Sequence, residues 1–297
     1  MAGTRRAGRM LGNLQISRAL ELTMSFDPQM FFPHISKDEW LPYREWLVPR
    51  AMDPQTGDLL LPCQSYIVRT SLHTILIDSC VGNDKERTNR PAWHQKSDST
   101  YLDALAANGL APEDIDYVMC THLHGDHVGW NTRLVNGEWV PTFPNAKYIF
   151  SEKEFDQWKN VGHEKFTDHP LVDSVLPIVA AGRAQLVSSD FALDDEVWLE
   201  PSPGHTPDHF SVRLKSQGAN AVMTGDMMHS PIQCVHPEWI PWPDWDPEQA
   251  IATRRSCLET WADTDMLVCT AHFPLPSAGR IGSDAGAWRF EYDEHDW

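Results

Sequence analysis

Short apolar runs alternate with helical patterns along most of the chain. Apolar, β-branched runs that stop at Gly, Pro or Asp are typical of buried strands, and they occur at residues 14–26, 66–68, 74–77, 117–120, 139–148, 197–200, 210–214, 221–224 and 266–269. Helical spacing and capping residues predict helices over 99–108, from 112, and over 151–158, 169–181 and 246–264. This alternation favours a layered α/β fold.

Residues 26 to 58 do not follow this pattern. Phe31, Phe32, Trp40 and Trp46 stand among several prolines with no clear period, which predicts an extended arm that is rich in aromatic residues and proline. Such an arm covers the core, caps a pocket or contacts a second subunit. Composition does not shift elsewhere along residues 1–297, so we expect a single domain.

Side chains that can bind metal come directly after four of the predicted strands. The stretch HLHGDH occupies residues 122–127, and His205, Asp226 and His272 each come directly after an apolar run or its turn. Residues at successive strand ends converge on one crevice in layered α/β folds. Five histidines and two aspartates placed in this way are enough to hold two metal ions.

The spacing inside this set divides it between two ions. His122 and His124 can bind one ion from the same side, while Asp126 and His127 face a second ion after the turn that Gly125 allows. Asp226 can bridge both ions through its two oxygens. Imidazole and carboxylate ligands without thiolate suit zinc, and iron, manganese or cobalt fit the same ligands.

Composition narrows the kinds of partner. The formal net charge of -18 argues against a nucleic-acid surface, which needs clustered Lys and Arg. The six cysteines show no CxxC pair and are expected to be buried free thiols of a reducing compartment. The chain has no apolar stretch long enough for a signal peptide or a membrane span, so a cytoplasmic protein without membrane contact is expected.

These motifs resemble those of the metallo-β-lactamase-fold hydrolases. The resemblance runs over roughly residues 60 to 292 and is carried by IDS at 77–79, HLHGDH at 122–127, GHTPDH at 204–209, TGD at 224–226 and AHF at 271–273. It implies a four-layer αββα sandwich with the metals at one edge. It also implies that His122, His124 and His205 hold the first metal, that Asp126, His127 and His272 hold the second, and that Asp226 bridges them. Asp78 and His209 would orient the ligand imidazoles.

Within this family, the ligand spacings and the C-terminal stretch are most similar to the branch of quorum-signal lactonases, 4-pyridoxolactonase and methyl parathion hydrolase. A ligand cysteine, which some β-lactamases use, is absent from the sequence at these positions. His229 stands three residues after Asp226, where acyl-homoserine lactonases of this branch carry a Tyr. This difference weakens the case for a homoserine lactone as substrate.

The predicted function is a dinuclear zinc hydrolase that acts on a small hydrophobic ester or lactone, with a metal-bridging hydroxide as the nucleophile. The predicted catalytic residues are Asp126, Asp226, which would pass a proton to the leaving group, and His229, which would donate to the oxyanion. Aromatic residues predict a substrate wall, namely Trp130, Trp239, Trp242, Trp245 and Phe273.

Two alternatives stay open. The same centre would also suit an organophosphate triester hydrolase or a hydrolytic dehalogenase, and a member without turnover would bind a small molecule as a sensor. A small-molecule ligand is expected in each case. A homodimer is expected from the aromatic arm and from the relatives in this branch.

Overall fold

The computed structural model describes residues 8–160, 170–295 and 297. Contacts divide the chain into two compact units. The first unit is Met1–Glu21, Gln64–Ser189 and His295–Trp297, and the second unit is Leu22–Cys63 and Asp190–Glu294. Within the described residues, no helix is long and apolar enough to cross a membrane.

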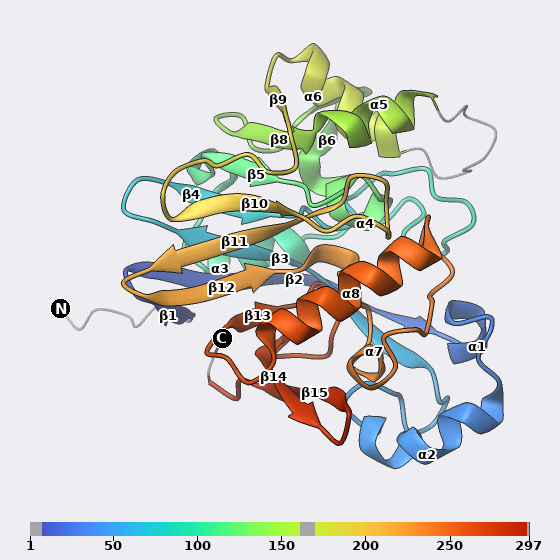
Figure 1. Ribbon diagram of the computed structural model, residues 1–297. Helices are drawn as coiled ribbons and strands as arrows, with labels where there is room; N and C mark the ends of the chain where they lie inside the picture. Colours follow the sequence, from blue (N-terminus) through green and yellow to red (C-terminus); the bar gives the residue numbers. More distant parts are fainter. Residues whose placement is uncertain (1–7, 161–169, 296) are drawn as a thin grey trace. The chain divides into compact units, whose positions relative to one another are not determined.

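A seven-stranded sheet provides the frame of the first unit. Its order is β1 (Arg9–Leu11), β2 (Leu14–Phe26), β3 (Leu59–Arg69), β4 (Thr74–Ile77), β5 (Tyr117–Met119), β8 (Lys147–Ser151) and β9 (Ala184–Val187) (Figure 1). The strands predicted at 66–68 and 74–77 are confirmed, and β3 and β4 pair antiparallel with Tyr66 opposite Ile77. Strands β4, β5 and β8 are parallel, so their carboxyl ends lie at the same edge. Asp78 and the stretch HLHGDH follow β4 and β5 at that edge.

Short helices cover this sheet and carry its connections. They are α3 (Thr100–Ala107), η1 (Pro112–Asp114), α4 (Gly125–Val128), η2 (Gly129–Asn131), α5 (Glu152–Asn160), the π-helix η3 (Leu171–Val175) and α6 (Leu176–Ala180), with a hairpin of β6 (Thr132–Val135) and β7 (Glu138–Pro141). The Tyr101 hydroxyl on α3 hydrogen-bonds Ser65 on β3 at 2.7 Å, which fixes that helix to the sheet. Four predicted helices are confirmed here, although residue 169 of the predicted 169–181 helix lies outside the described residues.

A six-stranded sheet provides the frame of the second unit. Its order is β10 (Val197–Pro201), β11 (Phe210–Ser216), β12 (Ala219–Met223), β13 (Leu267–Cys269), β14 (Ala278–Asp284) and β15 (Ala287–Tyr292). Strands β12 and β13 are parallel, so Asp226, in η4 (Gly225–Met227), and His272 follow the same edge. A short helix, α7 (Ile232–Val235), follows η4 in the chain.

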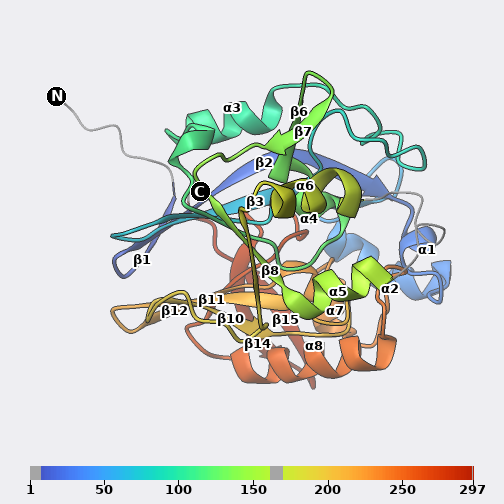
Figure 2. The ribbon, with the colours of Figure 1, turned by 90° about the horizontal axis from the view of Figure 1, so that it is seen from above.

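Helix α8 (Pro247–Trp261) lies along one face of this sheet (Figures 1 and 2). Asp246 caps it by accepting from the Gln249 backbone N–H at 3.0 Å, as the predicted helix over 246–264 requires. Its Leu258 and Trp261 side chains are buried against Val222 and Val268 of the sheet. All six cysteines are free and all but Cys257 are buried, which confirms the prediction of buried thiols.

The extended arm expected at 26–58 is wrong in its secondary structure. Residues Pro28–Phe31 form α1 and Lys37–Leu47 form α2. The Glu39 carboxylate accepts from the Ser36 backbone N–H at 2.9 Å and from the Ser36 hydroxyl at 2.6 Å, which is the capping-box signal for a helix start. Pro42 inside α2 and the irregular aromatic spacing concealed this signal.

Candidate metal centre

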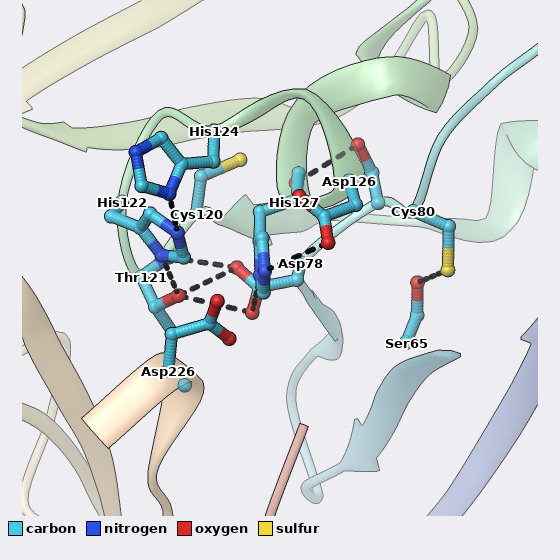
Figure 3. A network of polar contacts seen from close by, with 12 residues as sticks. Ser65, Asp78, Cys80, Cys120, Thr121, His122, His124, Asp126, His127 and Asp226 are labelled. Carbon is cyan, nitrogen blue, oxygen red and sulfur yellow. Dashed lines mark hydrogen bonds and ion pairs between the residues drawn. The ribbon is translucent and has the colours of Figure 1, made fainter. Parts of the chain in front are cut away.

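The stretch after β5 is fixed in the first unit by a buried carboxylate (Figure 3). Asp78 accepts from the Thr121 backbone N–H at 2.8 Å and from the Thr121 hydroxyl at 3.0 Å. It also lies 2.9 Å from His127 Nδ1, and because an ionised carboxylate only accepts, Nδ1 donates. The ring lone pair of His127 is therefore on Nε2.

This loop carries two pairs of side chains that can bind metal. We call the four residues the loop ligand group (His122, His124, Asp126 and His127). His122 Nε2 lies 3.0 Å from His124 Nδ1, while the other nitrogen of His122 contacts the Thr121 hydroxyl at 3.0 Å. His127 Nε2 lies 3.8 Å from Asp126 Oδ2. These two pairs are the ones that the sequence spacing assigned to two different ions.

The loop after β4 also holds the end of this group by backbone contacts. The Ser79 backbone N–H donates to the His127 carbonyl at 2.8 Å, and the Gly129 N–H donates to the Cys80 carbonyl at 2.7 Å. A side chain at Gly129 would overlap the Val81 carbonyl, so only glycine permits this approach. The ligand loop is thus fixed on both sides.

In the second unit, His205 is oriented by Asp244, which the sequence reasoning did not find. His205 Nδ1 lies 2.9 Å from Asp244 Oδ1, and Arg254 donates to the other carboxylate oxygen at 3.2 Å. Burial alone would raise the pKa of Asp244, but the hydrogen bond from His205 and the Arg254 charge lower it below its ordinary value. Asp244 is therefore a buried carboxylate that stays ionised, and its bond to Nδ1 places the ring lone pair of His205 on Nε2.

Asp226 faces two imidazoles with its two oxygens. Its Oδ2 lies 3.3 Å from His205 Nε2, and its Oδ1 lies 3.0 Å from His272 Nε2. The other nitrogen of His272 donates to the Pro62 carbonyl at 2.7 Å, which fixes the tautomer. We call His205, Asp226 and His272 the strand-end ligand group. Its geometry is that of a carboxylate shared between two ligand pairs.

His209 supports this group from behind. Its Nε2 accepts from the Asp226 backbone N–H at 3.0 Å, and its Nδ1 donates to the Ser202 hydroxyl at 2.9 Å. Both of its ring nitrogens are thus engaged with protein groups. His209 therefore lies directly beside Asp226.

His229 is also buried beside Asp226. Its Nε2 lies 3.1 Å from Asp226 Oδ2, and its ring stacks on that of His272 at 5.6 Å. Burial lowers the pKa of His229 below its ordinary value, although the Asp226 charge opposes this shift. His205, His229 and Asp244 place ligand-type atoms within 4.8 Å of one another, but Asp244 is already paired with Arg254.

The predicted aromatic wall divides into buried and exposed members. Trp130 is stacked on Tyr101 and donates to Glu21, and Phe273 packs against Phe290 in the core. Trp239 is also buried, against Trp40. Only Trp242 and Trp245 expose about half of their side chains, 49% and 47%. The three buried rings are used mainly in packing.

Each metal-type atom pair has a separation that suits a zinc ion. Ligands at about 2.0–2.1 Å from a tetrahedral ion lie roughly 3.3 Å apart. The four pairs measure 3.0, 3.8, 3.3 and 3.0 Å. Nitrogen and carboxylate donors, with the second imidazole nitrogen held by a protein group, are those of metal centres in proteins. The residues present therefore fit divalent metal ions.

Comparison with known proteins agrees with this fit. Residues 59–272 match the model of the Metallo-beta-lactamase superfamily. Similar curated proteins are the N-acyl homoserine lactonases of Bacillus cereus (25% identical over 178 residues, 56% of this chain and 64% of the relative) and Bacillus thuringiensis (24% over 209 residues, 66% and 76%). The chain thus spans less than two thirds of the Bacillus cereus relative.

Solved structures share the fold over nearly the whole chain. The hydrolase AbOPH of the beta lactamase superfamily has a TM-score of 0.81 at 25% identity, covering 99% of this chain and 100% of that one. AidC, a dizinc quorum-quenching lactonase, has a TM-score of 0.79 at 22% identity and covers 98% and 99%. The chain belongs to the metallo-beta-lactamase superfamily and has its α/β fold, as the sequence motifs predicted.

Proposed function

We propose that the chain is a dinuclear metal-dependent hydrolase that cleaves a small hydrophobic ester or lactone. The superfamily supports a metal centre, and the N-acyl homoserine lactonases among the relatives support the kind of bond. The observation that carries the proposal is the Asp226 carboxylate, because its two oxygens face Nε2 atoms of two different histidines. A carboxylate in this arrangement is suited to bridge two ions.

In this proposal the loop ligand group and the strand-end ligand group supply four ligands to each ion. As the family resemblance implies, one ion would be held by His122, His124, His205 and Asp226, and the other by Asp126, His127, His272 and Asp226. Zinc suits these donors, with iron, manganese or cobalt as alternatives. Two such ions, when bound, lower the pKa of a water molecule and polarise the substrate oxygen.

The side chains around the ligands then have separate tasks. Asp226 would pass a proton to the leaving group, and His229, whose Nε2 lies 3.1 Å from Asp226 Oδ2, would donate to the developing oxyanion. Asp126 is the third proposed catalytic residue. Of the predicted aromatic wall, Trp242 and Trp245 keep exposed ring surface for an apolar substrate group.

The proposal is tested with purified, zinc-loaded protein and a panel of chromogenic substrates, namely an aryl ester, a lactone, a phosphotriester and a haloalkane. Turnover of the ester or the lactone above the others is the expected result. Preference for the phosphotriester or the haloalkane would move the assignment to those alternatives. Two bound ions without turnover of any substrate would favour the sensor.

A further inference from the structure

Helix α5 of the first unit brings an aromatic side chain to a proposed metal ligand. The Trp158 ring lies edge-on to the His124 ring, with centroids 5.7 Å apart and planes at 90°. His124 Nδ1 belongs to the His122 pair described above. The indole is therefore in direct contact with a residue that would bind an ion.

A buried carboxylate fixes the orientation of this indole. Glu154 is fully buried, and its Oε1 accepts from Trp158 Nε1 at 2.9 Å. The Glu154 backbone N–H in turn donates to the Ser151 hydroxyl at 3.2 Å, which holds the first turn of α5. Burying a carboxylate is costly unless it is hydrogen-bonded. This bond holds the indole in one orientation beside His124.

The exposed side of the loop ligand group is the side that carries His124. His122 and His127 are buried, whereas His124, Gly125 and Asp126 are partly exposed, as is Trp158. A molecule that reaches the loop ligand group from solvent thus meets the partly exposed residues first. Trp158 contacts one of them and keeps ring surface of its own.

We propose that Trp158 is a specificity-determining residue that packs against a flat aryl or ring group of the substrate bound beside His124. Glu154 is its positioning residue. This inference rests on the proposed function and narrows the substrate to an ester or lactone with a planar apolar group next to the scissile bond.

The test is calorimetric binding of two probes, phenylphosphonate and methylphosphonate, to zinc-loaded protein. The two probes share the oxygens that bind metal and differ only in the flat apolar group. We expect the wild-type protein to prefer phenylphosphonate about tenfold. Trp158→Ala should abolish this preference without changing the Kd of methylphosphonate or the zinc content, and Trp158→Phe should keep part of it.

Glu154 is tested in the same assay. Glu154→Leu removes the acceptor of the indole N–H and should reduce the preference, whereas Glu154→Gln keeps an acceptor oxygen and should restore it. Trp198→Ala is the matched control, because Trp198 is a partly exposed residue of β10 that contacts Arg213. Its preference should equal that of the wild type.

Two results would overturn the inference alone. These are an unchanged phenyl preference in Trp158→Ala and Trp158→Phe, or no preference in a wild-type protein that binds both probes and hydrolyses esters. A zinc-loaded protein that binds neither probe and hydrolyses no substrate would overturn the proposed function and the inference together.

Discussion

The two ligand groups differ in how the chain builds them. The loop ligand group comes from one stretch of six residues, and two of its members, His124 and Asp126, are partly exposed. The strand-end ligand group comes from three separate segments, and His205, Asp226 and His272 are only 2–3% exposed. The first is fixed by a local turn, while the second depends on the sheet that delivers its segments.

The groups also differ in the buried carboxylate that orients a histidine of each group. Asp78 orients His127 and also accepts a hydrogen bond from the Thr121 backbone N–H. Asp244 orients His205 but also neutralises Arg254, and the side chains of both are fully buried. Damage to support in the first unit should therefore change mainly metal binding, whereas damage in the second unit should also change folding stability.

Asp244→Ala should produce the largest effect on stability. It leaves the Arg254 charge buried without its carboxylate, which costs about 3–5 kcal/mol, and it also frees the His205 ring. Urea unfolding of the metal-free protein measures this loss. Asp78→Ala is the matched comparison, expected to lower metal affinity about 10–100-fold with a smaller loss of stability. Equal losses of stability would contradict the distinction between the two units.

Asp226→Asn should lower kcat/KM for hydrolysis about 100-fold or more, since removal of a partner that only orients a ligand lowers activity by up to that amount. The amide keeps the shape but replaces one carboxylate oxygen by a donor, so it no longer faces both histidines as an acceptor. The measurement is kcat/KM on the best substrate of the panel, together with zinc content. Full activity with both ions bound would exclude the proposed role of Asp226.

Lys85→Met should change the folding stability less than Asp244→Ala does, and in the opposite direction. The Lys85 ammonium is buried in the first unit beside Asp173 and Arg87, and it donates to the Thr132 hydroxyl at 2.6 Å. Burial lowers the pKa of Lys85 to about 7, although the Asp173 charge opposes this shift. Arg87 still pairs with both oxygens of Asp173 when Lys85 is replaced. Removal of the buried ammonium should therefore stabilise the protein by on the order of 1 kcal/mol at pH 7.

The sign of the pH effect follows from that lowered pKa. Between pH 7 and the ordinary pKa of 10.5, the unfolded chain holds a proton on Lys85 that the folded chain has released. Wild-type stability therefore rises with pH across this window, and the penalty is fully present below it. Lys85→Met should lose that rise, whereas Lys215→Met, at an exposed position of β11, should keep it. Urea unfolding at pH 7 and 9 decides this.

Much of the frame and of the ligand set was predictable because the signals are local. Strand residues such as those of β4 and β5 are apolar in sequence as they are buried in the structure, and ligand-type residues follow them directly. The helices α1 and α2 were missed because their aromatic residues have no helical period. The capping pair Ser36 and Glu39 was the signal that could have shown α2.

The orienting groups were less predictable. Asp244 is 39 residues from His205 and the Pro62 carbonyl is 210 residues from His272, so no spacing connects them. Residue type also does not reveal burial. Trp130 and Phe273 were expected to face a substrate, and the structure places both in packed surroundings. Trp158 differs from them because it is partly exposed and its ring contacts His124, a contact visible only in three dimensions.

The number of zinc ions per chain tests the two-ion centre most directly. Calorimetric titration of the metal-free protein, checked by elemental analysis, should give two ions for the wild type. His205→Ala and His272→Ala remove a ligand of different ions in the proposal, so each should weaken one binding step and keep the other. One ion in the wild type, or loss of the same step in both variants, would contradict the account.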